Sequence, residues 1–193
     1  MDVEKERCIW CLSSELYKKY HDEEWGIPVY DDNIFFEFLL LETFQAGLSW
    51  ITILNKRENF KKAFDNFDYK KIAIYTDNKI LDLLQDAGII RNKLKVYFAV
   101  INAQNFLKIQ EEYGSFSEYI WKFVDNKPLK NFPEKHSDIL STTLLSDKIS
   151  KDLKRRGFKF VGSTVIYAFM QATGIVNDHV AGCFRVNNNL HPD

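Results

Sequence analysis

The chain has 193 residues with a formal net charge of −1, of which 46% are hydrophobic and 27% charged, so a soluble globular protein of one domain or two small lobes is expected. No apolar run approaches the roughly 20 residues that span a bilayer, which excludes an ordinary membrane protein. The polar start over residues 1–7 does not predict a secretory signal, so we expect a cytoplasmic protein.

Helical periodicity dominates the first half of the chain. Acidic and amide side chains at 31–33 can cap a helix that ends near Gly47, with an apolar face of Phe35, Phe38, Leu39 and Leu41. A short helix is expected over 49–53. Asp77 can cap another helix that reaches Leu84, with a buried stripe of Ile80, Leu81 and Leu84.

The second half continues the helical pattern. A long amphipathic helix is expected over 92–113 and a shorter one over 116–124, after an interruption at Gly88. Residues 125–141 contain two prolines and are predicted to be a loop. Helices over 146–156 and 162–173 complete the chain. Because no convincing pair of alternating strands is present, the expected fold class is all-α, as a single compact domain over 1–193 or two lobes that share one core.

Cysteines and histidines near the two chain ends suggest a metal site. Three cysteines cannot form a disulfide framework. Cys8 and His21 lie near the start, and His179 and Cys183 form an i, i+4 pair that one helical turn would bring to one side. Cysteine and histidine are the usual ligands of tetrahedral zinc, and four protein ligands make a closed, structural site.

The spacing leaves alternatives open, because Cys8 and Cys11 form a CxxC motif. Cys11 could replace His21 as a ligand. A redox CxxC is a further alternative, but it lacks the βαβ context that such motifs have. Buried cysteines and ordinary histidines without any metal would also explain the pattern.

A lone carboxylate, Glu42, lies in the apolar segment Leu39–Phe44. A buried carboxylate is costly unless it is paired or protonated, which makes Glu42 a candidate functional residue. Aromatic side chains bracket it in sequence and could form a slot for a flat base: Trp10, Tyr17, Tyr20, Trp25 and Trp50. A solvent-facing Glu42 and aromatics that only fill the core are the alternatives.

Residues 83–93 predict a helix, a tight glycine turn and a second helix. Gly88, Arg91 and Lys93 would place free N–H groups and positive charge at the turn, where they can hold a DNA phosphate. An ordinary helical hairpin is the alternative.

Charge is also distributed unevenly. Residues 1–42 carry eleven acidic and four basic side chains, a local −7, so the remaining residues carry +6. The segment 147–159 has a local +4. A run of this kind is usually a solvated helix face, but it is also a second candidate for backbone contact.

Six longer segments occur in this order along the chain: YHDEEWG (20–26), QAGLSW (45–50), KREN (56–59), DAGIIR (86–91), RGFKFVG (156–162) and VNDH (176–179). Together they resemble the 3-methyladenine DNA glycosylase I family of bacterial base-excision repair. The resemblance extends from about Glu6 to Cys183.

The resemblance implies a helix-hairpin-helix fold with one structural zinc ion that joins the N- and C-terminal segments. Its zinc ligands fall on Cys8, His21, His179 and Cys183, which favours His21 over Cys11. Its base-pocket acid falls on Glu42, and its pocket aromatics fall on Trp10, Tyr17, Tyr20 and Trp50. The implied substrate is double-stranded DNA that contains an alkylated adenine, which the enzyme flips out and releases as free 3-methyladenine.

Many members of the wider helix-hairpin-helix superfamily carry a catalytic aspartate some twenty residues beyond the hairpin. Residues 103–112 contain Glu111 and Glu112 but no aspartate, and nothing marks Lys93 as a Schiff-base lysine. We therefore expect a monofunctional glycosylase without a lyase step, acting as a monomer without an obligate protein partner. Leu48 is a candidate wedge for the gap left by the flipped base, with a buried loop leucine as the alternative.

Two other functions remain as alternatives. One is a zinc-stabilised module that recognises DNA without cutting it. The other is a zinc hydrolase, which would need three protein ligands and an open coordination position for water.

Overall fold

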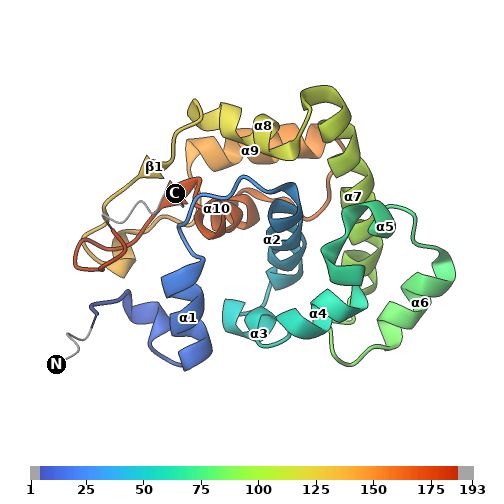
Figure 1. Cartoon of the computed structure of the whole chain (residues 1–193), viewed down its shortest axis with the longest axis horizontal. Helices are drawn as coiled ribbons and strands as arrows, with labels where there is room; N and C mark the ends of the chain where they lie inside the picture. Colours follow the sequence, from blue (N-terminus) through green and yellow to red (C-terminus); the bar gives the residue numbers. More distant parts are fainter. Residues whose placement is uncertain (1–4, 187–193) are drawn as a thin grey trace.

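The computed structural model describes residues 5–186, and its helices pack around a central helix, α2 (Figure 1). The α-helices are α1 (Glu15–Glu23), α2 (Asp32–Gln45), α3 (Trp50–Leu54), α4 (Arg57–Ala63), α5 (Tyr69–Ile72), α6 (Asp77–Gln85), α7 (Lys93–Tyr113), α8 (Phe116–Trp121), α9 (Leu144–Arg155) and α10 (Ser163–Ala172). Short 3-10 helices cover Ile9–Cys11, Asp65–Phe67, Lys122–Val124 and His136–Asp138. The predicted all-α class is confirmed.

Besides helices, the regular structure of the described residues includes a small parallel pairing that sequence patterning did not predict. Strand β1 (Leu129–Lys130) pairs with β2 (Val176–Asn177), with Leu129 opposite Val176. Each strand has two residues, which is too short to show an alternating pattern. The pairing ties the predicted 125–141 loop to the segment that follows α10.

Helix starts follow the capping chemistry of the sequence. Asp31 accepts hydrogen bonds from two backbone N–H groups at the start of α2, and Asn92 accepts one at the start of α7. The expected Asp77 cap is wrong by one residue, because Thr76 is the cap and Asp77 is the first helical residue. Ser14, Ser115 and Thr143 cap α1, α8 and α9 in the same way.

Helix α2 is buried on nearly all sides, so the expected one-sided apolar face is only part of its buried surface. Every residue from Phe35 to Phe44 except Glu37 is buried, because α10, α7, α3 and α8 pack around the helix. A helix surrounded in this way has no polar face along which periodicity could be recognised. Its burial is what places Glu42 inside the protein.

Three helices were not predicted: α1, α4 and α5. They have 9, 7 and 4 residues. The predicted stripe on α6 is also partly wrong, because Leu81 is 54% exposed whereas Ile80 and Leu83 are buried. The face of α6 that packs on α7 therefore includes Leu83 in place of the expected Leu81.

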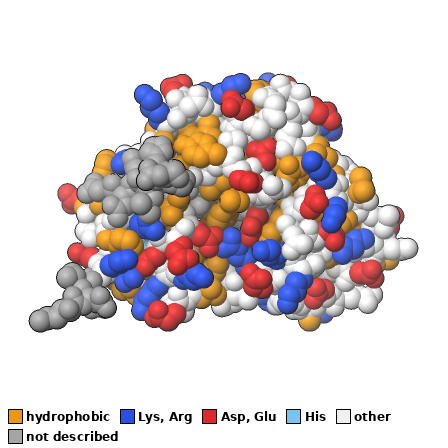
Figure 2. Space-filling view, viewed as in Figure 1, with side chains coloured by type: hydrophobic (Ala, Val, Ile, Leu, Met, Phe, Trp, Pro, Cys, Tyr) orange, Lys and Arg blue, Asp and Glu red, His pale blue; other side chains and the backbone are white. Residues whose placement is uncertain are grey.

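The two ends of the described chain lie beside one another. The N–H of Phe184 donates to the carbonyl of Glu6 at 2.9 Å. Gly174, with φ +65, crosses the Ile27–Pro28 backbone so closely that a Cβ would lie 2.2 Å from the Ile27 carbonyl carbon, so only glycine fits. Among the described helices, none is long and apolar enough to cross a membrane. Acidic and basic side chains are interspersed over the face shown in Figure 2.

Candidate base pocket and metal cluster

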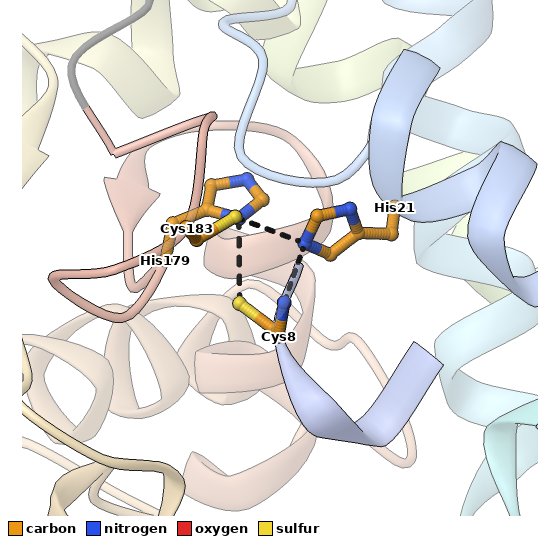
Figure 3. Close-up of side chains that lie close together, drawn as sticks. All are labelled: Cys8, His21, His179 and Cys183. Atoms are coloured by element: carbon orange, nitrogen blue, oxygen red, sulfur yellow. Dashed lines mark hydrogen bonds between the residues drawn. The ribbon is translucent and has the colours of Figure 1, made fainter. Parts of the chain in front are cut away.

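Four side chains from the two chain ends converge on one buried point (Figure 3): Cys8, His21, His179 and Cys183. Their ligand atoms lie within 4.8 Å of one another. Cys183 Sγ is 3.4 Å from His21 Nε2 and from His179 Nδ1. Zinc–ligand bonds of roughly 2.0–2.3 Å give a tetrahedron with edges of roughly 3.5 Å, so this donor set fits a single tetrahedral metal ion.

Each histidine of this cluster is oriented by a hydrogen-bond partner on the side of its ring that faces away from the cluster. The Nδ1 of His21 lies 2.8 Å from an Asp22 carboxylate oxygen, and the Nε2 of His179 lies 3.0 Å from the Trp25 carbonyl. Each imidazole therefore faces the cluster with the other ring nitrogen. Such outer partners fix the tautomer and angle of a metal-binding histidine.

The cysteines differ from one another in their ionisation. The hydrogen bond from the Cys8 thiol, and to a smaller extent those from the two imidazoles, lower the pKa of Cys183 well below its ordinary value. The contact with Cys183 and burial raise the pKa of Cys8. The cluster therefore favours at least one thiolate, the form that binds metal. Cys11 lies outside it, with its Sγ donating to the Cys8 carbonyl at 3.1 Å.

Local structure at the C-terminal pair differs from the expectation. His179 and Cys183 are brought together by turns rather than by a helix. The N–H of Cys183 donates to the carbonyl of Val180 at 2.8 Å, which closes the turn. The i, i+4 spacing was therefore informative, although the predicted helical turn was wrong.

A pocket of about 330 Å³ opens beside the cluster, within the size range of small-molecule sites. It is lined by Trp10, Tyr17, Tyr20, Trp25, Glu42, Gln45, Trp50, His136, Ile139, Leu140, Ser141, Thr164, Tyr167, Ala168 and Gln171. Glu42 and the four aromatic residues that the resemblance assigns to the base pocket are all among them. The contributions of the 136–141 segment and of α10 were not predicted, because nothing in the sequence indicates that these distant segments meet α2.

Among residues 5–186, Glu42 is the only carboxylate in this lining. Its side chain is 3% exposed, and its Oε2 has no hydrogen-bond partner in the described part of the chain. Burial raises the pKa of Glu42 to about 8, because the ionised form loses its hydration without gaining a partner. The pocket therefore presents a carboxyl group that an incoming cation or hydrogen-bond donor would satisfy.

Trp50 is the second unsatisfied group. Its indole Nε1 is buried and lacks a hydrogen-bond partner among residues 5–186. The Trp50 ring lies 5.4 Å from the Tyr20 ring, and Trp10 lies 4.9 Å from Tyr17. Flat rings in the lining, with one free donor and one free carboxyl, suit a flat heterocycle that carries both polar edges and charge.

Two tryptophans join the pocket to the metal cluster. Trp10 lies 5.3 Å from the His21 ring, and Trp25 lies 4.6 Å from the His179 ring. Both tryptophans also line the pocket. The positions of these pocket walls therefore depend on the imidazoles that the cluster holds.

The predicted glycine turn between α6 and α7 is present. Asp86 accepts a hydrogen bond from the Gly88 N–H at 2.7 Å, and a Cβ on Gly88 would lie 2.9 Å from that carboxylate. Arg91 and Lys93 are exposed beside the turn. Lys56, which was not predicted, donates to the Ala87 and Gly88 carbonyls at 3.2 Å each and holds the turn against the start of α4.

The other sequence candidates for DNA contact differ in placement. Leu48 is 41% exposed in the loop between α2 and α3, so the buried-leucine alternative is wrong. Helix α9, which carries the basic segment, lies at the opposite edge of the molecule from the α6–α7 turn in Figure 1. Arg156, just after α9, is already paired with Glu112 and Asp152. A DNA-contact surface that includes the α6–α7 turn and the pocket would therefore not include α9.

Comparison with known proteins gives a consistent assignment. Residues 10–186 match the methyladenine glycosylase family. The chain belongs to this family. A curated family member, DNA-3-methyladenine glycosylase 1 of Escherichia coli (strain K12), is 47% identical over 178 residues, which cover 92% of this chain and 95% of the relative.

Solved structures of the methyladenine glycosylase family share the fold. A crystal structure of 3-methyladenine DNA glycosylase I has a TM-score of 0.90 and 45% identity, covering 93% of this chain and 98% of that one. A variant of 3-methyladenine DNA glycosylase I in complex with 3-methyladenine has a TM-score of 0.91 and 36% identity, covering 94% and 98%. The resemblance recognised in the sequence is confirmed at the level of family and fold.

Proposed function

We propose that this protein is a DNA glycosylase that extracts 3-methyladenine from double-stranded DNA and hydrolyses its N-glycosidic bond. The observation that carries the proposal is the pair of unsatisfied buried groups, Glu42 Oε2 and Trp50 Nε1, in an aromatic pocket of a methyladenine glycosylase family member. Relatives of this chain are named for 3-methyladenine. The protein acts as a single domain and as a monomer.

The pocket discriminates by charge. A base inside a duplex cannot reach the pocket, so it is flipped out, at a cost of a few kcal/mol. Methylation at N3 makes adenine cationic, and a cation over an aromatic ring gains roughly 0.5–2 kcal/mol that neutral adenine does not. Trp50 and Tyr20 supply such rings, and Glu42 supplies the negative charge.

Glu42 acts mainly in recognition. The methylated base is already a good leaving group, so the protein need not supply a strong acid. When the cationic base enters, it favours the ionised form of Glu42 and lowers the pKa that burial had raised. The resulting carboxylate would also stabilise positive charge that develops on the sugar.

The metal cluster serves the fold. Cys8, His21, His179 and Cys183 would hold one zinc ion, and a bound ion would supply cross-linking of the two chain ends. Four protein ligands leave no open position, and the four donors are all buried. These residues therefore favour a structural site over the zinc-hydrolase alternative.

DNA contacts come from the hairpin and the neighbouring loop. The exposed Arg91 and Lys93, beside the turn at Gly88, contact phosphates of the duplex. Leu48 enters the gap left by the flipped base, and its 41% exposure supports this role. No lysine lines the pocket among the described residues, which supports a monofunctional enzyme without a lyase step.

Base release tests the proposal directly. The purified protein is incubated with duplex DNA treated with a methylating agent, and released bases are identified by chromatography, with Glu42→Ala in parallel. We expect 3-methyladenine from the wild type and at least a hundredfold slower release from the variant. Release by the wild type without strand cleavage, unless alkali is added, would support the monofunctional mechanism.

Two results would contradict these assignments. A folded, metal-loaded protein that releases no base would favour a lesion-binding module. Binding to a lesion duplex that barely responds to salt would contradict the phosphate contacts, because each contact adds roughly 0.9 to the dependence of log K on log salt.

A further inference from the structure

Lys95 is an unusual lysine because its side chain is only 6% exposed. It is the third residue of α7. Its ammonium group donates to the Phe44 carbonyl at 2.8 Å and to the Ala46 carbonyl at 2.6 Å. Within the described residues it forms no ion pair with a carboxylate. Burial lowers the pKa of Lys95, so the fold bears a cost to keep a cation at this place.

The two carbonyls lie where α2 ends. Helix ends leave carbonyl groups without partners inside the helix and carry partial negative charge, which a cation satisfies. Gln45, between the two carbonyl residues, lines the pocket. The loop that follows turns at Gly47, with φ +84, and carries the exposed Leu48. Lys95 therefore holds the segment from which both a pocket wall and the wedge project.

The backbone of Lys95 lies in the first turn of α7, directly after the hairpin turn at Gly88. Its backbone N–H donates to Asn92 Oδ1 at 3.1 Å, which caps α7 immediately after the turn at Gly88. One residue thus connects the phosphate-binding turn to the end of α2. The sequence separation between Lys95 and Ala46 is 49 residues, so no local interaction could fix this distance.

We propose that Lys95 is a positioning residue, which sets Leu48 at a fixed distance from the hairpin so that backbone contact and base extrusion occur together. The proposal rests on the proposed function. Extrusion requires the wedge to meet a base step at a defined distance from the phosphates that the hairpin holds. Misplacement by about 1 Å can cost about a hundredfold in rate.

Substitution can separate this role from general stability. Lys95→Met keeps the length of the apolar stem but removes all donors and the charge. Lys95→Arg restores the charge and the donors. Lys108→Met is the matched control, because Lys108 is an exposed lysine on the same helix and its loss changes the net charge equally.

Three measurements are compared for these variants. One is single-turnover release of 3-methyladenine from methylated duplex DNA. The second is the affinity for free 3-methyladenine, followed by tryptophan fluorescence. The third is the fluorescence of 2-aminopurine placed opposite an abasic analogue in a duplex, which reports wedge insertion without requiring catalysis. If Lys95→Met does not fold at the assay temperature, Lys95→Gln, which keeps one donor group, replaces it.

We expect Lys95→Met to lose about tenfold or more in release and most of the 2-aminopurine signal, with free-base affinity changed less than about threefold. Lys95→Arg should recover part of both losses, and Lys108→Met should match the wild type. Release by Lys95→Met within twofold of wild type, or a parallel loss of free-base affinity, would overturn the proposal. Failure of the wild type to release base would instead contradict the proposed function, while the 2-aminopurine signal would still test Lys95.

Discussion

The metal cluster and the base pocket share two tryptophans but differ in how their polar atoms are satisfied. In the cluster, the outward nitrogens of His21 and His179 each contact an oxygen. In the pocket, Glu42 Oε2 and Trp50 Nε1 are buried without partners in the described structure. Buried polar groups are normally hydrogen-bonded. The cluster is therefore organised before any substrate arrives, whereas the pocket keeps unsatisfied groups that a substrate can satisfy.

The largest expected effect comes from opening the cluster. Cys183→Ser should abolish binding of one metal ion per chain and lower the free energy of unfolding by about 5 kcal/mol or more, because metal binding to a folded site contributes directly to folding. Because Trp10 and Trp25 contact the cluster histidines, tryptophan emission should also shift. Metal content, thermal melting and emission spectra check this. Retention of one metal ion would contradict the ligand set.

Glu42→Gln should have opposite effects on activity and on stability. Release of 3-methyladenine should fall by about a hundredfold or more, because the variant lacks the negative charge. The folded pKa of about 8 exceeds the ordinary value of 4.5, so the wild type loses stability as pH rises from 4.5 through 8. This loss reaches roughly 5 kcal/mol at full ionisation.

Glu42→Gln should therefore be more stable than the wild type at pH 9 and differ little at pH 4. Melting temperatures across this range check the sign. Glu111→Gln, at an exposed position of α7, is the control and should keep the pH dependence of the wild type. An equal stability difference between Glu42→Gln and the wild type at both pH values would contradict the burial of an unpaired carboxyl group.

A pair of tryptophan variants sharpens the comparison. Trp50→Phe removes an unsatisfied donor and should slow base release by about tenfold, the value of one hydrogen bond to a charged partner. Trp121→Phe removes a donor that bonds to the Val29 carbonyl at 2.8 Å, away from the pocket. It should lower the melting temperature and leave release unchanged. Slower base release by Trp121→Phe, with release by Trp50→Phe unchanged, would contradict the idea that the unsatisfied donor of Trp50 serves the substrate.

The smallest effect is expected at Cys11. Cys11→Ala removes a thiol that bonds to the Cys8 carbonyl and lies outside the cluster. Stability should fall by about 1 kcal/mol, and metal content should stay at one ion per chain. Loss of the metal would mean that Cys11 binds it in place of His21.

Much of the fold was predictable because helix signals are local. The caps at Asp31 and Asn92 and the long helix after the hairpin follow from neighbouring residues. The helices α1, α4 and α5 were missed, and the two-residue strands are too short to show an alternating pattern. The wrong stripe on α6 has a different cause, since Leu81 and Leu84 share a helix face by spacing but only the packing of α7 decides which side is covered.

The sequence alone determined which chemistry is available: two cysteines and two histidines at the chain ends, one carboxylate in an apolar segment, and a glycine turn followed by basic residues. These are properties of residue types and local spacing. Only the tertiary structure decided that Glu42 Oε2 has no partner among the described residues, that the 136–141 segment lines the pocket, and that Lys95 holds the end of α2. Each depends on contacts between residues far apart in the chain, which burial and hydrogen-bond satisfaction select only when the whole core is assembled.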